Sequence, residues 1–116
     1  MTRAQTGRAA EDLAAAFLRA KGWTVLERNF RVKTGEIDLV ARDGDEVVFV
    51  EVRARASRDF GGAAASVDAG KRRRLVRAAR AWLAARGWDG PCRFDVVAVD
   101  GGRLEHLPAA FGADGR

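Results

Sequence analysis

Three acidic side chains, Glu36, Asp38 and Glu51, lie on two apolar segments that flank the dipeptide Asp43-Gly44. An Asp-Gly pair between apolar runs is a strong signal for a β-hairpin. If these two residues form the loop, Glu36 lies opposite Glu51, Asp38 is a diagonal neighbour of Glu51, and all three acids share one face with Arg53. Because like charges directly opposite each other destabilise a sheet, the cluster requires a positive partner, either a metal ion or basic side chains.

The shared face depends on the length of the hairpin loop. A four-residue loop from Arg42 to Asp45 keeps the same side chains together. A three-residue loop moves Glu51 to the opposite face unless a β-bulge compensates. We adopt the two-residue loop as the expected register.

Asp38 and Glu51 on adjacent strands suit a hard divalent cation. Mg²⁺ or Mn²⁺ is often held by only one or two carboxylates, while waters and substrate phosphate complete the shell. Arg53 is two residues beyond Glu51 on the same face, where a cation could hold a hydroxide nucleophile or a phosphate. The chemistry that these groups support is metal-assisted phosphodiester hydrolysis.

A structural explanation competes with this one, because charged side chains on an exposed sheet face commonly form a solvated ladder of ion pairs. The members would be Glu36, Asp38, Glu51, Arg53 and Arg55. Val47 and Phe49 share the same face, however, which makes that face partly buried. Buried carboxylates need a specific partner.

The elements that must position these residues follow from periodicity and turn signals. The sequence predicts helices over 8–21 and 68–86, with Asp68 as N-cap and Gly87 as the stop. Strands are expected over 23–30, 36–42, 46–54, 92–99 and 103–107, a polar connection over 29–35 and a loop over 56–65. The order α-β-β-β-α-β-β predicts an α/β fold, a mixed sheet flanked by helices. One domain spans 1–116, with 1–7 and 108–116 expected to be loose.

Composition limits the kinds of molecule that the protein is expected to bind and the compartment in which it is expected to work. The net charge of +5 favours a polyanion such as nucleic acid. The single cysteine, Cys92, expected to be buried, excludes an intrachain disulfide framework and suits a reducing cytoplasm. No apolar run approaches the roughly 20 residues that span a bilayer, so no membrane association is expected. Trp82 is expected in the core, and His106 is expected to be structural or exposed rather than catalytic. Asp95 is expected to cap, to pair with Arg93 or Arg103, or to have no role.

Basic residues recur at helical spacing in the second expected helix. They are Lys71, Arg73, Arg74, Arg77 and Arg80. A solvated helix face is the common explanation for such a stripe. The positive balance of the chain and the hairpin acids favour contact with nucleic-acid phosphates instead.

The hairpin segments Gly35-Glu36-Ile37-Asp38-Leu39 and Phe49-Val50-Glu51-Val52-Arg53 resemble the acid-bearing hairpin of the PD-(D/E)XK nuclease superfamily. Within it, the chain is most similar to the YraN-like family of small bacterial proteins, related to Holliday-junction resolvases. The resemblance covers nearly the whole chain. It extends to Gly7, Glu11, Gly22-Trp23, Asn29-Phe30-Arg31, Phe60-Gly61, Lys71 and the segment 93–97.

This resemblance implies a restriction-endonuclease-like fold with Asp38 and Glu51 as metal-binding acids, Glu11 as an assisting acid and Glu36 as an auxiliary one. Arg53 stands where the superfamily has lysine. Arginine can clamp phosphate, but it stays protonated and is a poorer proton carrier. With 18 arginines and three lysines in the chain, the exchange reflects either coding drift or weakened catalysis.

The sequence therefore predicts a cytoplasmic, nucleic-acid-binding endonuclease that uses Mg²⁺ or Mn²⁺. DNA rather than RNA is the expected substrate, in branched or single-stranded form, and related resolvases act as homodimers. Two alternatives stay open. One is a nucleic-acid-binding module with weak or no hydrolysis, and the other is a protein-interaction domain.

Overall fold

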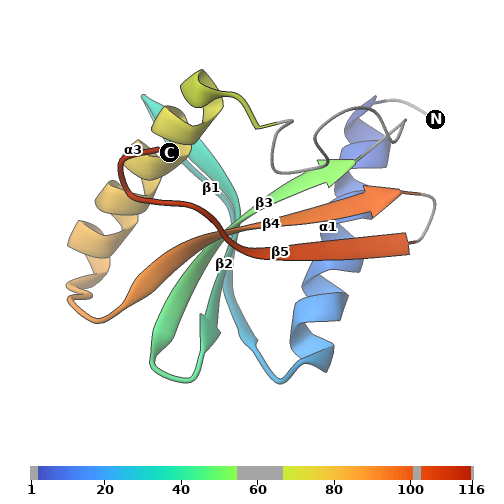
Figure 1. Cartoon of the computed structure of the whole chain (residues 1–116), viewed down its shortest axis with the longest axis horizontal. Coiled ribbons are helices and arrows are strands. Elements are labelled where there is room, and N and C mark those ends of the chain that lie inside the picture. The colour runs from blue at the N-terminus through green and yellow to red at the C-terminus, as the bar shows by residue number, and fades with distance from the viewer. Residues whose placement is uncertain (1–2, 55–66, 101–102, 116) are drawn as a thin grey trace.

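The computed structural model describes residues 3–54, 67–100 and 103–115. Five strands form one sheet, and helices α1 and α3 pack on its opposite faces (Figure 1). The elements are α1 (Arg3–Ala20), β1 (Thr24–Val32), β2 (Gly35–Asp43), β3 (Glu46–Ala54), α3 (Ala69–Arg86), β4 (Cys92–Asp100) and β5 (Arg103–Phe111). The predicted α/β class and element order are confirmed.

The strands lie side by side in chain order, β1-β2-β3-β4-β5. Every neighbouring pair is antiparallel except β3 and β4, which run parallel. A parallel pair needs a long crossover connection, and here α3 supplies it. The crossover brings the first turn of α3 close to β3, the strand that carries Glu51.

Two apolar layers hold the sheet between the helices. On the α3 side, Phe49 contacts Trp82 edge-on and stacks on Phe94. On the α1 side, Leu18 packs with Val48 and Val50. The central strand β3 is therefore buried on both faces, which explains its run of valines. Trp82 belongs to the core, as predicted.

The boundaries of α3 confirm the predicted capping signals. The Asp68 side chain accepts a hydrogen bond of 2.8 Å from the Lys71 main-chain N–H. Gly87 ends the helix with a φ of 62° in the left-handed region, a conformation that costs glycine little. The cap fixes where the first turn of α3 begins, and this turn carries Lys71.

The β2–β3 register differs from the expected one by two residues. Asp43 pairs with Glu46 and Leu39 with Val50, so the loop is Gly44-Asp45 rather than Asp43-Gly44. Gly44 has a φ of 62° and opens the loop. The sequence placed the turn one residue too early, because the ladder continues through Asp43. A two-residue change preserves the parity, so the same side chains still share a face.

Three other elements are longer than predicted from the sequence. β1 continues to Val32, which packs against the α3-side core, so the predicted connection over 29–35 shrinks to a turn. β5 continues beyond residue 107 because Phe111 is buried and stacks on Phe94 at 5.2 Å. Helix α1 already begins at Arg3. The expectation of loose segments is therefore wrong for 3–7 and 108–111.

Cys92 is exposed, contrary to the prediction, because it opens β4 at the end of the sheet. The loop expected over 56–65 lies outside the described residues. None of the described helices is long and apolar enough to cross a membrane.

Candidate active site

Asp38 and Glu51 meet where the β2–β3 ladder ends. Its last pair is Leu39 with Val50, and the next position in the same register sets Asp38 opposite Glu51. Asp38 Oδ2 accepts a hydrogen bond of 2.8 Å from the main-chain N–H of Val52. Glu51 is only 3 % exposed. The structure thus brings the two acids closer together than the diagonal placement predicted from the sequence.

Burial sets the electrostatics of this acid pair. Desolvation, and then the charge of Glu51, raise the pKa of Asp38 from 3.8 to about 7. The pKa of Glu51 is also raised by burial, against the opposing effects of Lys71 and Arg53 and of a hydrogen bond with Asp38. Two partly desolvated carboxylates this close resist simultaneous ionisation. The pair therefore calls for a proton or a cation near neutral pH.

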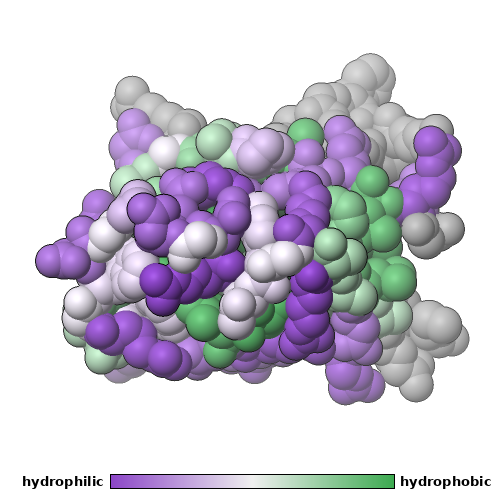
Figure 2. Space-filling view, turned by 90° about the horizontal axis from the view of Figure 1, so that it is seen from below, coloured by the Kyte–Doolittle hydropathy of each residue, from purple (hydrophilic) through white to green (hydrophobic). Residues whose placement is uncertain are grey.

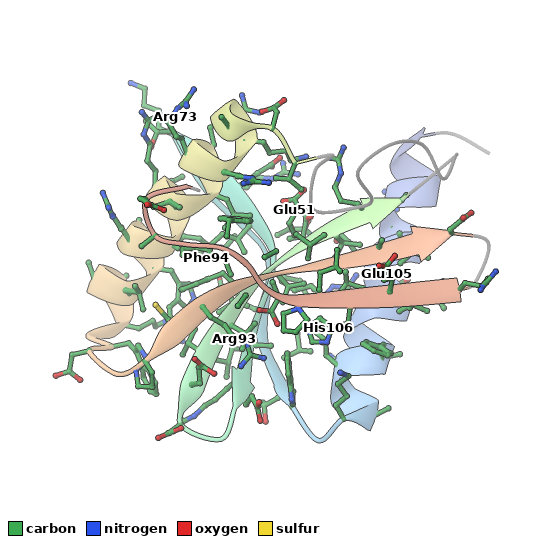
Figure 3. The ribbon with its side chains drawn as sticks, viewed as in Figure 1. Glu51, Arg73, Arg93, Phe94, Glu105 and His106 are labelled. Carbon is green, nitrogen blue, oxygen red and sulfur yellow. The ribbon has the colours of Figure 1, made fainter. Side chains whose placement is uncertain are left out.

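Lys71 supplies one positive charge to the acid pair. Its Nζ lies 3.0 Å from Glu51 Oε1. Figure 3 shows Glu51 near the end of β3, below the first turn of α3 from which Lys71 comes. Sequence reasoning assigned Lys71 to a nucleic-acid surface and missed this contact. The sequence did contain a signal for it. Lys71 is one of only three lysines, and it stands three residues after the helix cap Asp68.

Arg53 lies on the same strand, two residues beyond Glu51, and its charge lowers the pKa of Glu51 less than Lys71 does. The arginine is half-buried. Its influence on Glu51 agrees with the predicted shared face. Both cations therefore act on Glu51, and Lys71 forms an ion pair with it at 3.0 Å.

Glu11 also approaches the acid pair, from the helix on the other face of the sheet. Its charge raises the pKa of Asp38. Within the described chain, the buried Oε1 of Glu11 has no hydrogen-bond partner, and Arg28 Nη2 lies 3.8 Å from it. A buried carboxylate oxygen without a donor is costly. Glu11, Asp38 and Glu51 thus converge at the end of the β2–β3 ladder.

Glu36 is placed differently from the other acids. Its side chain is 55 % exposed and forms an ion pair of 3.3 Å with Arg31 on β1. The observed register no longer sets it opposite Glu51. Its auxiliary role stays a prediction.

Gly35, at the start of β2, presses directly on α3. A Cβ atom at this position would lie 1.8 Å from the main-chain oxygen of Arg74. Only glycine permits so close an approach of the two backbones. This contact holds the strand of Asp38 against the helix of Lys71.

The basic side chains of α3 are largely on the surface. Arg73, Arg74, Arg77 and Arg80 are exposed, and Figure 3 shows Arg73 pointing outward from the start of α3. The exposure fits both a solvated stripe and a phosphate-binding surface. Their role in nucleic-acid binding stays a prediction.

A second buried carboxylate, Asp95, lies away from the acid pair. It pairs with Arg93, one of the predicted partners, at 3.0 Å. His106 Nε2 lies 2.7 Å from Asp95 Oδ2, and the main-chain N–H of Ala109 donates to Oδ1 at 2.9 Å. Figure 3 shows Arg93 and His106 together, apart from Glu51. These contacts tie His106 and Arg93 to Asp95, a carboxylate separate from the acid pair.

The residues present fit a hard divalent cation. No group of three or more His, Cys, Asp or Glu side chains placed to bind a metal occurs among the residues that the structure describes. Two carboxylates are nevertheless enough for Mg²⁺ or Mn²⁺ when water and phosphate complete the shell. The raised pKa of Asp38 and the unpartnered Glu11 oxygen both indicate a deficit of positive charge here.

Comparison with known proteins identifies relatives of this chain. Residues 10–99 match the model of the family described as "Uncharacterised protein family UPF0102". A UPF0102 protein of Dechloromonas aromatica is 55% identical over 113 residues, which cover 97% of this chain and 93% of that protein. A UPF0102 protein of Nitrosomonas europaea is 56% identical over 108 residues, covering 90% of this chain and 92% of that protein.

Proposed function

Since the chain belongs to the UPF0102 family, and its hairpin resembles that of PD-(D/E)XK nucleases, we propose that it is a nucleic-acid-binding endonuclease. It hydrolyses phosphodiester bonds with Mg²⁺ or Mn²⁺. The observation that carries the proposal is the pair of the half-buried Asp38 and the buried Glu51, with Lys71 at 3.0 Å from Glu51 and the pKa of Asp38 raised to about 7.

Asp38 and Glu51 would hold the cation. Such an ion lowers the pKa of water and offsets charge that develops on a phosphate. The raised pKa values of both carboxylates show that the positive charge of Lys71 does not fully offset their desolvation, and the cation would supply the remainder. Glu11, whose buried Oε1 has no hydrogen-bond partner among the described residues, would orient a water molecule beside Asp38.

Lys71 and Arg53 divide the work of the single lysine expected after Glu51. The Lys71 ammonium is a compact charge that can approach an attacking water and exchange a proton. The guanidinium of Arg53 stays protonated and binds phosphate oxygens. On this proposal, the arginine at position 53 does not abolish hydrolysis, since α3 supplies the ammonium from a different element.

Nicking assays on branched and single-stranded DNA with Mn²⁺ test the proposal. The wild-type protein should cleave, and Asp38→Ala should reduce cleavage to background and so control for contamination. Lys71→Ala should lower the rate more than Arg53→Ala, and Arg53→Lys should retain or raise it. The same background rate in wild type and Asp38→Ala would favour a binding module without hydrolysis.

A metal-binding measurement separates the ion from the chemistry. Thermal unfolding of the wild type should shift upward with MnCl₂, because an ion that binds only the folded state stabilises it. Asp38→Asn should remove this shift. An equal shift in both proteins would place the ion elsewhere.

A further inference from the structure

A cleft of about 410 Å³ opens between the β1–β2 turn and the first turns of α3. Five basic side chains and one acid are among the residues that line it: Arg31, Lys33, Lys71, Arg74, Arg77 and Glu36. Two of the basic residues come from the β1–β2 turn region and three from α3, so opposite walls carry the same sign of charge. Sequence reasoning identified only the α3 wall.

Internal ion pairs leave much of this charge available. Glu36 offsets Arg31, and Glu51 offsets Lys71. Lys33 and Arg77 form no ion pair with another described residue. Like charges gathered in a concave surface raise the local potential and attract anions. Both side chains are exposed to solvent and also line the shared cleft.

The cleft is joined to the acid pair through Lys71, which lines the cleft and contacts Glu51 at 3.0 Å. The contact of Gly35 with the Arg74 backbone holds the two walls in register. An anion bound at the Lys71 end of the cleft would therefore lie next to Glu51. This placement favours a role for the basic charge at the site over a role in solubility alone.

We propose that the cleft binds the phosphodiester backbone on one side of the bond to be cleaved. The proposal rests on the proposed function, and it adds that the substrate is a polymer with a phosphate next to the scissile one. The volume is within the range of sites that hold small ligands, about 300–1,000 Å³. Among the described residues that line the cleft none is aromatic, so the contacts are to phosphate and not to stacked bases.

The basic surface also continues past the cleft. Arg77 borders a second hollow together with Arg73 and Arg80, further along α3. Arg31 borders a third hollow together with Arg8 and Glu11, on the side of α1. The cleft is thus the middle of a longer path that passes the acid pair. A strand on this path would meet phosphate-binding groups on both sides of the cleavage point.

Fluorescence anisotropy with labelled DNA and RNA of the same sequence tests the cleft. The buffer contains EDTA, so that hydrolysis does not contribute. The double variant Lys33→Ala/Arg77→Ala removes one charge from each wall, neither of which forms an ion pair with another described residue. Its affinity at about 0.1 M salt should fall on the order of tenfold or more, and the slope of log K against log salt should drop by roughly two. The loss should be the same for DNA and RNA.

The matched control is Arg19→Ala/Arg42→Ala. It removes the same charge from exposed residues on the last turn of α1 and the end of β2. Figure 2 views that opposite end of the molecule and shows that it is also largely hydrophilic, so the comparison tests position and not polarity. The control should lose less than about twofold in affinity.

Three outcomes would overturn the cleft proposal: an unchanged affinity of the cleft variant, an equal loss in the control, or a loss confined to one of the two nucleic acids. A protein that binds through the cleft in EDTA yet never cleaves with Mn²⁺ would overturn the proposed hydrolysis alone. Circular dichroism of both double variants should match the wild type, since all four side chains are exposed.

Discussion

Two regions of the molecule bury carboxylates, and they differ in the groups that surround the carboxylate oxygens. Asp95 is fully buried and receives hydrogen bonds from Arg93, His106 and the Ala109 main chain. Asp38, at the end of the β2–β3 ladder, accepts a hydrogen bond from the Val52 main chain and lies beside a second carboxylate, Glu51. The first carboxylate faces donors, whereas the second faces a group of its own charge. Burial alone is therefore a poor indicator of a functional acid, whereas a desolvated acid beside another acid is a better one.

The hydrogen bonds of the Asp95 region also define its protonation. Lys21 Nζ lies 3.0 Å from His106 Nδ1. Because an ammonium can only donate, Nδ1 accepts, and the ring proton is on Nε2, from which it is donated to Asp95. Every group of the Asp95 region thus has a complementary partner. Such a region stabilises the fold, because its donors and acceptors are matched to one another rather than offered to a ligand.

The same substitution at the two regions should have opposite effects on stability. Asp95→Asn turns one acceptor oxygen into a donor that faces other donors, and it should lower the free energy of unfolding by about 3 kcal/mol. Asp38→Asn should not lower it at pH 7. Urea denaturation of both variants measures the difference. A comparable loss in the two variants would remove the distinction between the regions.

Gly35→Ala should damage the acid pair through the backbone. A Cβ atom 1.8 Å from the Arg74 oxygen forces β2 and α3 apart, at a cost of about 1–3 kcal/mol. Gly7→Ala is the matched control, since no atom lies within 4 Å of its Cβ, and alanine favours a helix. Thermal unfolding of both variants tests this, and an unchanged Tm for Gly35→Ala would show that the two backbones separate freely.

The pH dependence of stability should report the raised pKa of Asp38. Between about pH 4 and pH 7 the folded protein keeps a proton that the unfolded chain has released, so stability should fall as pH rises through this window. Asp38→Asn should flatten the slope and gain about 1–2 kcal/mol at pH 7. Unfolding curves at several pH values measure it. A slope that survives the substitution would assign the titration to Glu51 or another group.

Much of the fold could be predicted because its signals are local. The cap at Asp68, the stop at Gly87 and the order of elements follow from neighbouring residues. The ends of β1 and β5 could not be predicted, because Val32 and Phe111 are held by contacts with α3 and β4 that are remote in sequence. Polar or turn-forming residues beside them suggested loops, and tertiary packing overrode that preference.

The candidate site was predictable only in part for the same reason. Strand parity places Asp38, Glu51 and Arg53 together whichever even loop is chosen, so an error in register did not separate them. The contact of Lys71 with Glu51 depends on how far the crossover carries α3, and no local pattern encodes that distance. The hairpin wall of the cleft was hidden likewise, since Lys33 looks like any polar turn residue.

The single parallel pair of strands has a consequence for how the chain folds. Strands β1 to β3 join through short turns, whereas β3 meets β4 only after the whole of α3 has been laid across the sheet. Non-local pairings form slowly because the loop entropy must be lost first. We expect the hairpin amides to gain protection before those of β4, so that Asp38 and Glu51 are neighbours before Lys71 arrives. Pulse-labelled hydrogen exchange during refolding would show this order, and simultaneous protection of all strands would contradict it.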